Sequence, residues 1–264
     1  STSRGGELME ELQHYGVKGM KWGRRKQKDV SFHKESNQKI ITNKDGSQTI
    51  PKGFVFNRVG RMPLDVNASG ALYVSHGKAD AARYIKSLGP TTMGKLLGTA
   101  GDKVQHISVK SSLKMASDEE VAKGVITYLD KNPKFLDKFN TSLYSAAVTG
   151  DFEKNISKED IKKALANPKS KESVKLAFGV TATLANPDYA DDSRKIYSTF
   201  KDKGYDAIPD TYDILTGTSQ TAMIVINPDK LSITSTTVIT KDVMKSAKTY
   251  LKSVEKLTVS DLVK

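Results

Sequence analysis

Four short segments carry side chains whose types and order could bind and act on a phosphorylated ligand. Arg58 lies near the end of an alternating stretch at residues 53–60, and its guanidinium is a rigid fork that suits a diphosphate. Ser75 ends a short apolar stretch just before a helical pattern, and its hydroxyl can orient a ligand or a neighbouring group. The segment Gly204–Asp206 and the residues around Gln220 each precede a later predicted strand. These segments are far apart in the chain, so the fold must bring them together.

The sequence does not contain the residues or motifs that several other kinds of site require. The chain has no cysteine, which excludes disulfides and thiolate metal sites. It has no Gly-x-x-x-x-Gly-Lys-Ser/Thr phosphate loop, no Gly-x-Gly-x-x-Gly before a helix and no Gly-x-Ser-x-Gly elbow. The four histidines do not have metal-ligand spacing, so we expect no metal site: His14, His33, His76 and His106.

The ordered set of Arg58, Tyr73-Val74-Ser75, Gly204–Asp206 and the segment at Gln220 resembles the Arg–Ser–Glu class of ADP-ribosyltransferases. In that family an arginine on the first core strand holds the phosphate and ribose of NAD, and a Ser-Thr-Ser-like strand braces the site. A glutamate before a late strand stabilises the positive charge that develops on the ribose. The resemblance covers roughly residues 31–240. It implies NAD as the cofactor, with Arg58 and Tyr73 binding it and Ser75 and Gln220 at the catalytic centre.

The sequence departs from the family pattern at the acidic position. Gln220 stands where the family has its glutamate, and no glutamate occurs between Glu172 and Glu255. A neutral amide cannot supply the negative charge, so the sequence leaves catalytic activity open. A nearby aspartate could replace the glutamate only if the fold brings it forward. The candidates are Asp206, Asp210 and Asp213, and Asp213 joins Gln220 and Ser75 as a predicted catalytic residue.

The N-terminal region, residues 1–30, holds a second recognisable segment. A short helical pattern at Gly6–Gln13 is followed by three regularly spaced glycines, the single tryptophan and a basic run. Residues 14–23 resemble the His-Tyr-Gly-Val-x-Gly-Met-x-Trp-Gly peptide of head-region and other structural proteins of tailed phages. We interpret this segment as a docking peptide with aromatic anchors, although it could instead pack on its own domain. Its predicted contact residues are His14, Tyr15, Gly16, Gly19, Met20 and Trp22.

The elements that must position these residues follow an α+β pattern, with strands first, helices in the middle and strands again. We expect a split β-sheet core of the ADP-ribosyltransferase type with a central helical segment. A domain at 31–240 would then be followed by a C-terminal helical segment at 241–264. The expected strands are 39–42, 53–60, 71–75, 104–109, 205–208, 222–226 and 231–234, with a hairpin turn at Asp45-Gly46. The expected helices are 78–88, 117–129, 133–147, 157–166, 187–203 and 241–256.

The net charge of +12 favours polyanionic partners, although most of the cations are lysines, the usual residues of a solvated surface. Three functions fit the sequence. The chain could be a phage head or virion protein with a degenerate ADP-ribosyltransferase-like fold, an active transferase that modifies a host protein, or a basic head protein that contacts DNA non-specifically. These place it in the virion or in the host cytoplasm. No apolar run is long enough to span a membrane.

Overall fold

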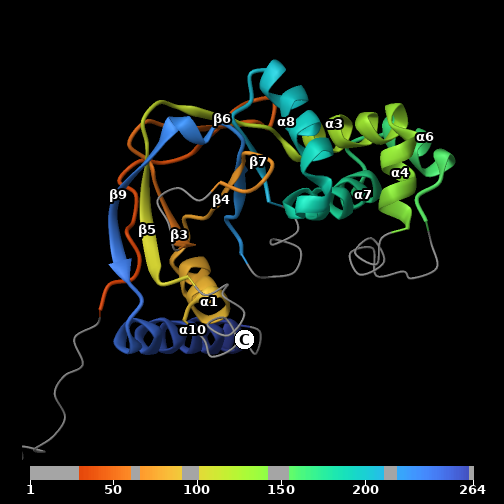
Figure 1. Ribbon diagram of the computed structural model, residues 1–264. Helices are drawn as coiled ribbons and strands as arrows, with labels where there is room; N and C mark the ends of the chain where they lie inside the picture. The colour runs from red at the N-terminus through yellow and green to blue at the C-terminus, as the bar shows by residue number, and fades with distance from the viewer. Residues whose placement is uncertain (1–29, 61–65, 91–100, 142–154, 211–218, 262–264) are drawn as a thin grey trace, which may run out of the picture. The chain divides into compact units, whose positions relative to one another are not determined.

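The computed structural model describes residues 30–60, 66–90, 101–141, 155–210 and 219–261. The chain divides into two units, Ser1–Val30 and Ser31–Lys264, and all structural statements below concern the second. This unit is mixed α+β with two separate sheets, so the α+β prediction is confirmed (Figure 1).

The larger sheet has six short strands in the order β1-β2-β6-β7-β8-β4. Neighbouring strands are antiparallel except β6 and β7, which are parallel. The strands are β1 (Ile41–Thr42), β2 (Gln48–Ile50), β4 (Leu72–Val74), β6 (Leu113–Met115), β7 (Ala207–Pro209) and β8 (Met223–Val225).

The smaller sheet is antiparallel and has the order β3-β5-β9. Its strands are β3 (Val55–Gly60), β5 (Lys103–Val109) and β9 (Leu231–Val238). An antiparallel bridge between Asn57 of β3 and Ser75, just after β4, ties the two sheets together. This bridge therefore joins the two segments in which sequence analysis places Arg58 and Ser75.

Several helices begin at a side chain that caps them. The Oγ atom of Ser117 accepts a hydrogen bond from the Glu120 amide, and Ser157 and Asp160 form a full reciprocal capping box. The α-helices are α1 (Lys78–Leu88), α3 (Asp118–Lys131), α4 (Pro133–Asn140), α6 (Lys158–Ala166), α7 (Lys171–Thr181), α8 (Ala190–Asp202) and α10 (Lys241–Asp261). Three short 3₁₀ turns are η1 (Ala182–Ala185), η2 (Pro187–Tyr189) and η3 (Pro228–Lys230).

The two faces of the six-stranded sheet belong to different cores, because alternate residues of a strand point to opposite faces. Ala207, Met223 and Val225 are buried with Phe56 and Ile107 of the smaller sheet. Ile208, Ile224 and Ile226 are instead buried with residues of α3, α4, α7 and α8. The sheet is therefore covered by helices on one face and by the second sheet on the other.

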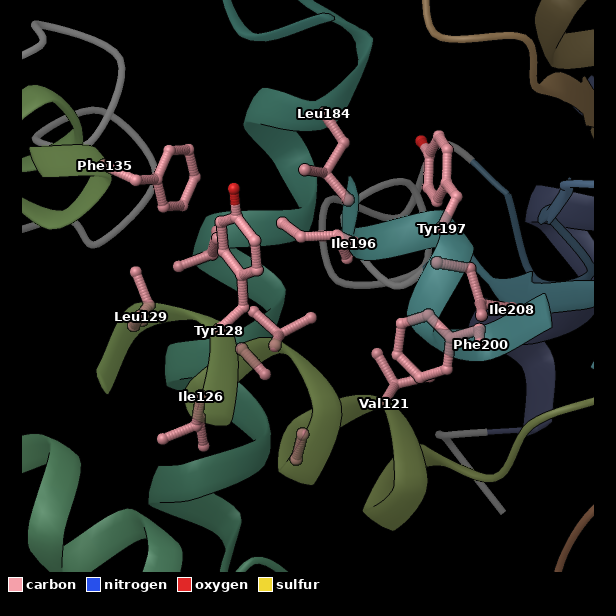
Figure 2. Packing of buried hydrophobic residues seen from close by; sticks show 14 of the residues in the cluster. Val121, Ile126, Tyr128, Leu129, Phe135, Leu184, Ile196, Tyr197, Phe200 and Ile208 are labelled. Carbon is pink, nitrogen blue, oxygen red and sulfur yellow. The ribbon is translucent and has the colours of Figure 1, made fainter. Parts of the chain in front are cut away.

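The helices α3, α4, α6, α7 and α8 pack on one another and share an apolar core (Figure 1). Figure 2 shows Phe200 of α8 beside Val121 of α3 and Ile208 of β7. Gly124 of α3 permits this packing, because a Cβ atom there would lie only 2.7 Å from Cζ of Phe200.

The structure confirms several sequence predictions and corrects others. The hairpin at Asp45-Gly46 and the helix at 78–88 are present as expected. The helix expected at 133–147 ends at Asn140, and its remaining residues 142–147 lie outside the described residues. Helix α7 and strand β6 were not predicted, because β6 has only three residues and α7 carries only a partial apolar stripe.

Candidate functional site

A cavity of about 220 Å³ opens where β3, β4 and α1 meet. Three of the residues singled out from the sequence for ligand contact, Arg58, Tyr73 and Ser75, lie in its lining. The other lining residues are Asn57, Val59, Val74, Tyr84, Leu88 and Asp210. The fold thus gathers a cation, a carboxylate, two tyrosines and a hydroxyl around one space.

The guanidinium of Arg58 is positioned by the strand next to its own. Arg58 pairs across β3 and β5 with Gln105, a fully buried residue. Nη1 of Arg58 donates a hydrogen bond of 3.2 Å to Oε1 of Gln105. Gly60 leaves the room for this arrangement, because a Cβ atom there would lie 2.5 Å from that same Nη1. A half-buried arginine held in this way is oriented for a ligand at lower entropic cost.

Ser75 is almost fully buried and joins the sheets. The amide of Asn57 donates to the Ser75 carbonyl at 2.7 Å, and the Ser75 amide and hydroxyl point back to the Asn57 carbonyl at 3.4 Å each. Ser75 therefore has a structural role at the wall of the cavity. Whether its hydroxyl also orients a ligand stays a prediction.

The side chain of Asn57 links three segments. Its amide nitrogen donates to the Lys34 carbonyl at 3.0 Å, and its oxygen accepts from the Lys34 amide at 2.9 Å. The same oxygen lies 2.7 Å from Nδ1 of His106, and Nε2 of His106 lies 2.9 Å from Oγ1 of Thr237. Burial lowers the pKa of His106, and nearby Lys34 and His33 lower it further. Because the Asn57 oxygen can only accept, Nδ1 of the His106 ring donates the hydrogen of this bond.

A buried carboxylate, Asp80 of α1, clamps the segment that precedes β8. Its Oδ1 accepts from the Gln220 amide at 2.9 Å, and its Oδ2 accepts from the amide of Thr221 at 3.0 Å and from the Thr221 hydroxyl. The Thr221 oxygen in turn accepts from the amides of His76 and Gly77, each at 3.0 Å. Arg83 completes the arrangement with an ion pair of 3.1 Å to Asp80.

This clamp fixes the place of Gln220. The residue lies just before β8, as expected, and β8 pairs with β4, which carries Tyr73. Its side chain, however, is exposed and does not line the cavity. The segments named from the sequence are neighbours in space, but Gln220 itself stands outside the cavity wall.

The three aspartates considered as replacements for the glutamate differ in their surroundings. Asp206 receives hydrogen bonds from the Lys114 amide and from Nδ2 of Asn227, and its ion pair with Lys230 spans 2.8 Å. Burial raises its pKa, but the bonds from Lys230, Lys114 and Asn227 outweigh burial and hold the pKa below its usual value. Asp206 is thus engaged in the fold. Asp210, only 6% exposed, lines the cavity, whereas Asp213 lies outside the described residues.

The remaining sequence predictions meet the structure only in part. The predicted docking residues lie outside the described residues: His14, Tyr15, Gly16, Gly19, Met20 and Trp22. Within the described ranges, no three His, Asp or Glu side chains gather in a way that could hold a metal ion. No helix of the described part of the chain is long and apolar enough to cross a membrane.

Comparisons with known proteins reach only the N-terminal region. Residues 6–29 match the model of a family described as a family of unknown function, DUF7211. No curated protein and no solved structure matched the chain.

Asp80, Asn57, Gln105 and Tyr84 are polar residues at or beside the cavity that sequence reasoning missed. Asp80 carried no distinguishing signal, because an acidic residue in the first turn of a helix is common and is favoured by the helix dipole. Gln105 and Asn57 carried none, because cross-strand neighbours become visible only once the strand register is known.

Proposed function

We propose that residues 31–240 form an ADP-ribosyltransferase-like domain whose cavity binds NAD, in a phage virion or head-associated protein held by its N-terminal peptide. The observation that carries the ligand proposal is the convergence of Arg58, Tyr73 and Ser75 on one cavity. These residues come from segments that the resemblance to the transferase family had singled out separately.

The chemistry of the cavity suits part of a dinucleotide. Arg58 offers a planar, permanently charged fork for a phosphate. Tyr84 offers a ring face and a hydroxyl, and Tyr73 offers part of its ring, for a ribose or a nicotinamide ring. The volume of about 220 Å³ is below the roughly 300–1,000 Å³ that encloses a drug-sized ligand, so only one ring-sized portion would be enclosed.

A second function, transfer of ADP-ribose, is favoured by one specific observation. Asp210 is a nearly buried carboxylate in the lining of the same cavity as Arg58. A fixed negative charge at that place would stabilise the positive charge that grows on the ribose as nicotinamide leaves. In this proposal Asp210 takes the part of the family's glutamate, and Gln220 remains an exposed loop residue.

Release of nicotinamide from NAD tests the transferase proposal. The native protein is compared with the Asp210→Asn and Gln220→Glu variants, and circular dichroism confirms that each is folded. Turnover that falls at least a hundredfold in Asp210→Asn, in line with the loss of one electrostatic stabiliser, supports Asp210. Turnover equal to that of the native protein in Asp210→Asn contradicts this assignment. Absence of turnover in the native protein, with NAD still bound, supports a virion protein with a retired transferase fold.

The virion part of the proposal rests on the resemblance of residues 14–23 to the tailed-phage peptide. The family match covers only residues 6–29, so this segment is a module distinct from the domain. Tyr15 and Trp22 are its aromatic anchors, the residue types that dominate binding hot spots. We expect the Tyr15→Ala, Trp22→Ala double variant of the full chain to be lost from purified particles. Normal incorporation of this variant would contradict the docking role.

A further inference from the structure

One face of the C-terminal helix α10 carries a row of four exposed lysines: Lys241, Lys245, Lys248 and Lys252. At 100° per residue, their side chains fall within a sector of about 60°. The row extends over about 16 Å along the helix axis. The opposite face is buried through Val243, Ala247 and Leu251, and α10 lies against α1 (Figure 1). The lysine row therefore stands on a helix that is fixed to the domain.

The lysine row does not serve the stability of the helix. None of the four lysines forms an ion pair with a residue in the described ranges. Like charges three and four residues apart on a helix repel each other. Lys241 also occupies the first residue of α10, where the helix dipole disfavours a cation. The four lysines therefore lower the stability of α10, and a bound anionic partner would offset this loss by screening their charges.

We propose that the lysine row of α10 is a contact surface for the phosphate backbone of duplex DNA, bound without regard to sequence. Duplex DNA carries one negative charge about every 1.7 Å of its axis, so a row of four lysines about 16 Å long can lie against several phosphates. Lysines act as point charges towards phosphate, whereas the arginines typical of base reading are absent from this face. The surface is separate from the NAD cavity and does not depend on the function proposed for it.

The burial pattern of α10 argues for DNA over a membrane surface. A helix that lies in a lipid interface must insert its apolar face among the acyl chains. In α10 that face is occupied, because Val243, Ala247 and Leu251 are buried in the protein. The residues that flank the lysines on the exposed side are polar, including Asp242, Thr249 and Ser253. Only the charged face is available to a partner.

Fluorescence anisotropy of a labelled 20-base-pair duplex, titrated with the full chain over a series of salt concentrations, tests this proposal. One variant replaces all four lysines of the row with glutamine. A matched control replaces four exposed lysines of α6 and α7 with glutamine, which removes the same charge: Lys162, Lys163, Lys171 and Lys175. The basic run at residues 24–28 is unchanged in all three proteins, so its contribution cancels.

We expect the α10 variant to lower the slope of log K against log salt by about 3 to 4, since each phosphate contact contributes about 0.9. The control variant should keep the native slope, and the α10 variant should melt no lower than the native protein, because it loses the repulsion between the lysines. Equal loss in the two variants would overturn the proposal, because net charge alone would then explain binding. Native protein that does not bind DNA would overturn it as well. So would an α10 variant that keeps its DNA affinity but no longer binds anionic phosphatidylserine vesicles.

Discussion

Replacement of Asp80 by asparagine should destabilise the domain strongly, because this carboxylate holds together three segments around the candidate site. Asp80 is 1% exposed and accepts hydrogen bonds from the amides of Gln220 and Thr221 and from the Thr221 hydroxyl. The Thr221 hydroxyl cannot turn to donate elsewhere, because its oxygen already accepts from His76 and Gly77. Asparagine preserves the volume of the side chain but presents an amide group to donors.

The magnitude follows from the number of bonds that asparagine cannot make. At least two bonds to the Oδ2 position become contacts between donors, and each hydrogen bond to a charged group contributes about 1.5–3 kcal/mol. We therefore expect a loss of about 3–5 kcal/mol in the free energy of unfolding. For a domain of this size that corresponds to roughly 10 °C in melting temperature.

Urea unfolding followed by circular dichroism measures this loss. Asp229→Asn is the matched control, because Asp229 is exposed and the substitution removes the same charge. If Asp80→Asn unfolds within about 1 kcal/mol of Asp229→Asn, the clamp does not hold the site and the reasoning is wrong.

Two further predictions concern packing and pH. Alanine normally favours a helix over glycine by about 1 kcal/mol. Gly124→Ala should nevertheless destabilise the protein by about 1–2 kcal/mol, because its Cβ would crowd Phe200. Lys123→Ala on the exposed face is the control, and a Gly124→Ala melting temperature above that of the native protein would contradict this packing. Burial lowers the pKa of both His76 and His106 below the unfolded value of 6.5. The unfolded chain therefore binds more protons, and the free energy of unfolding should be constant above about pH 7 and fall as pH drops below 6.5. Urea titrations that give the same free energy at pH 7.5 and pH 5.5 would refute this.

The elements with strong local signals were predictable from sequence. Helix α1 has the expected bounds, because the first residue of its pattern and the Gly89-Pro90 stop both lie in the local sequence. Strand β6 was not predictable, since its three residues pair with β2 and β7, which lie far away in the chain. Its pairing is decided by tertiary contacts rather than by periodicity.

The residues of the candidate site likewise divide into those that local sequence indicates and those that only the fold reveals. Arg58 and Ser75 could be named from their positions at the ends of apolar stretches. The choice among Asp206, Asp210 and Asp213 could not be made from sequence, because only the fold shows that Lys230 and Asn227 engage Asp206 while Asp210 lines the cavity. Asp80 was missed because its partners are backbone amides about 140 residues away.

Titration of NAD into the purified full chain by calorimetry, beside the Arg58→Ala and Gly60→Ala variants, tests the central claim most directly. We predict that the native protein binds NAD and that Arg58→Ala does not. Gly60→Ala should bind more weakly, because its Cβ would displace Nη1 of Arg58 and crowd the buried Gln105 side chain that holds it. Native protein that does not bind NAD, or Arg58→Ala that binds with unchanged affinity, would contradict the assignment of the cavity.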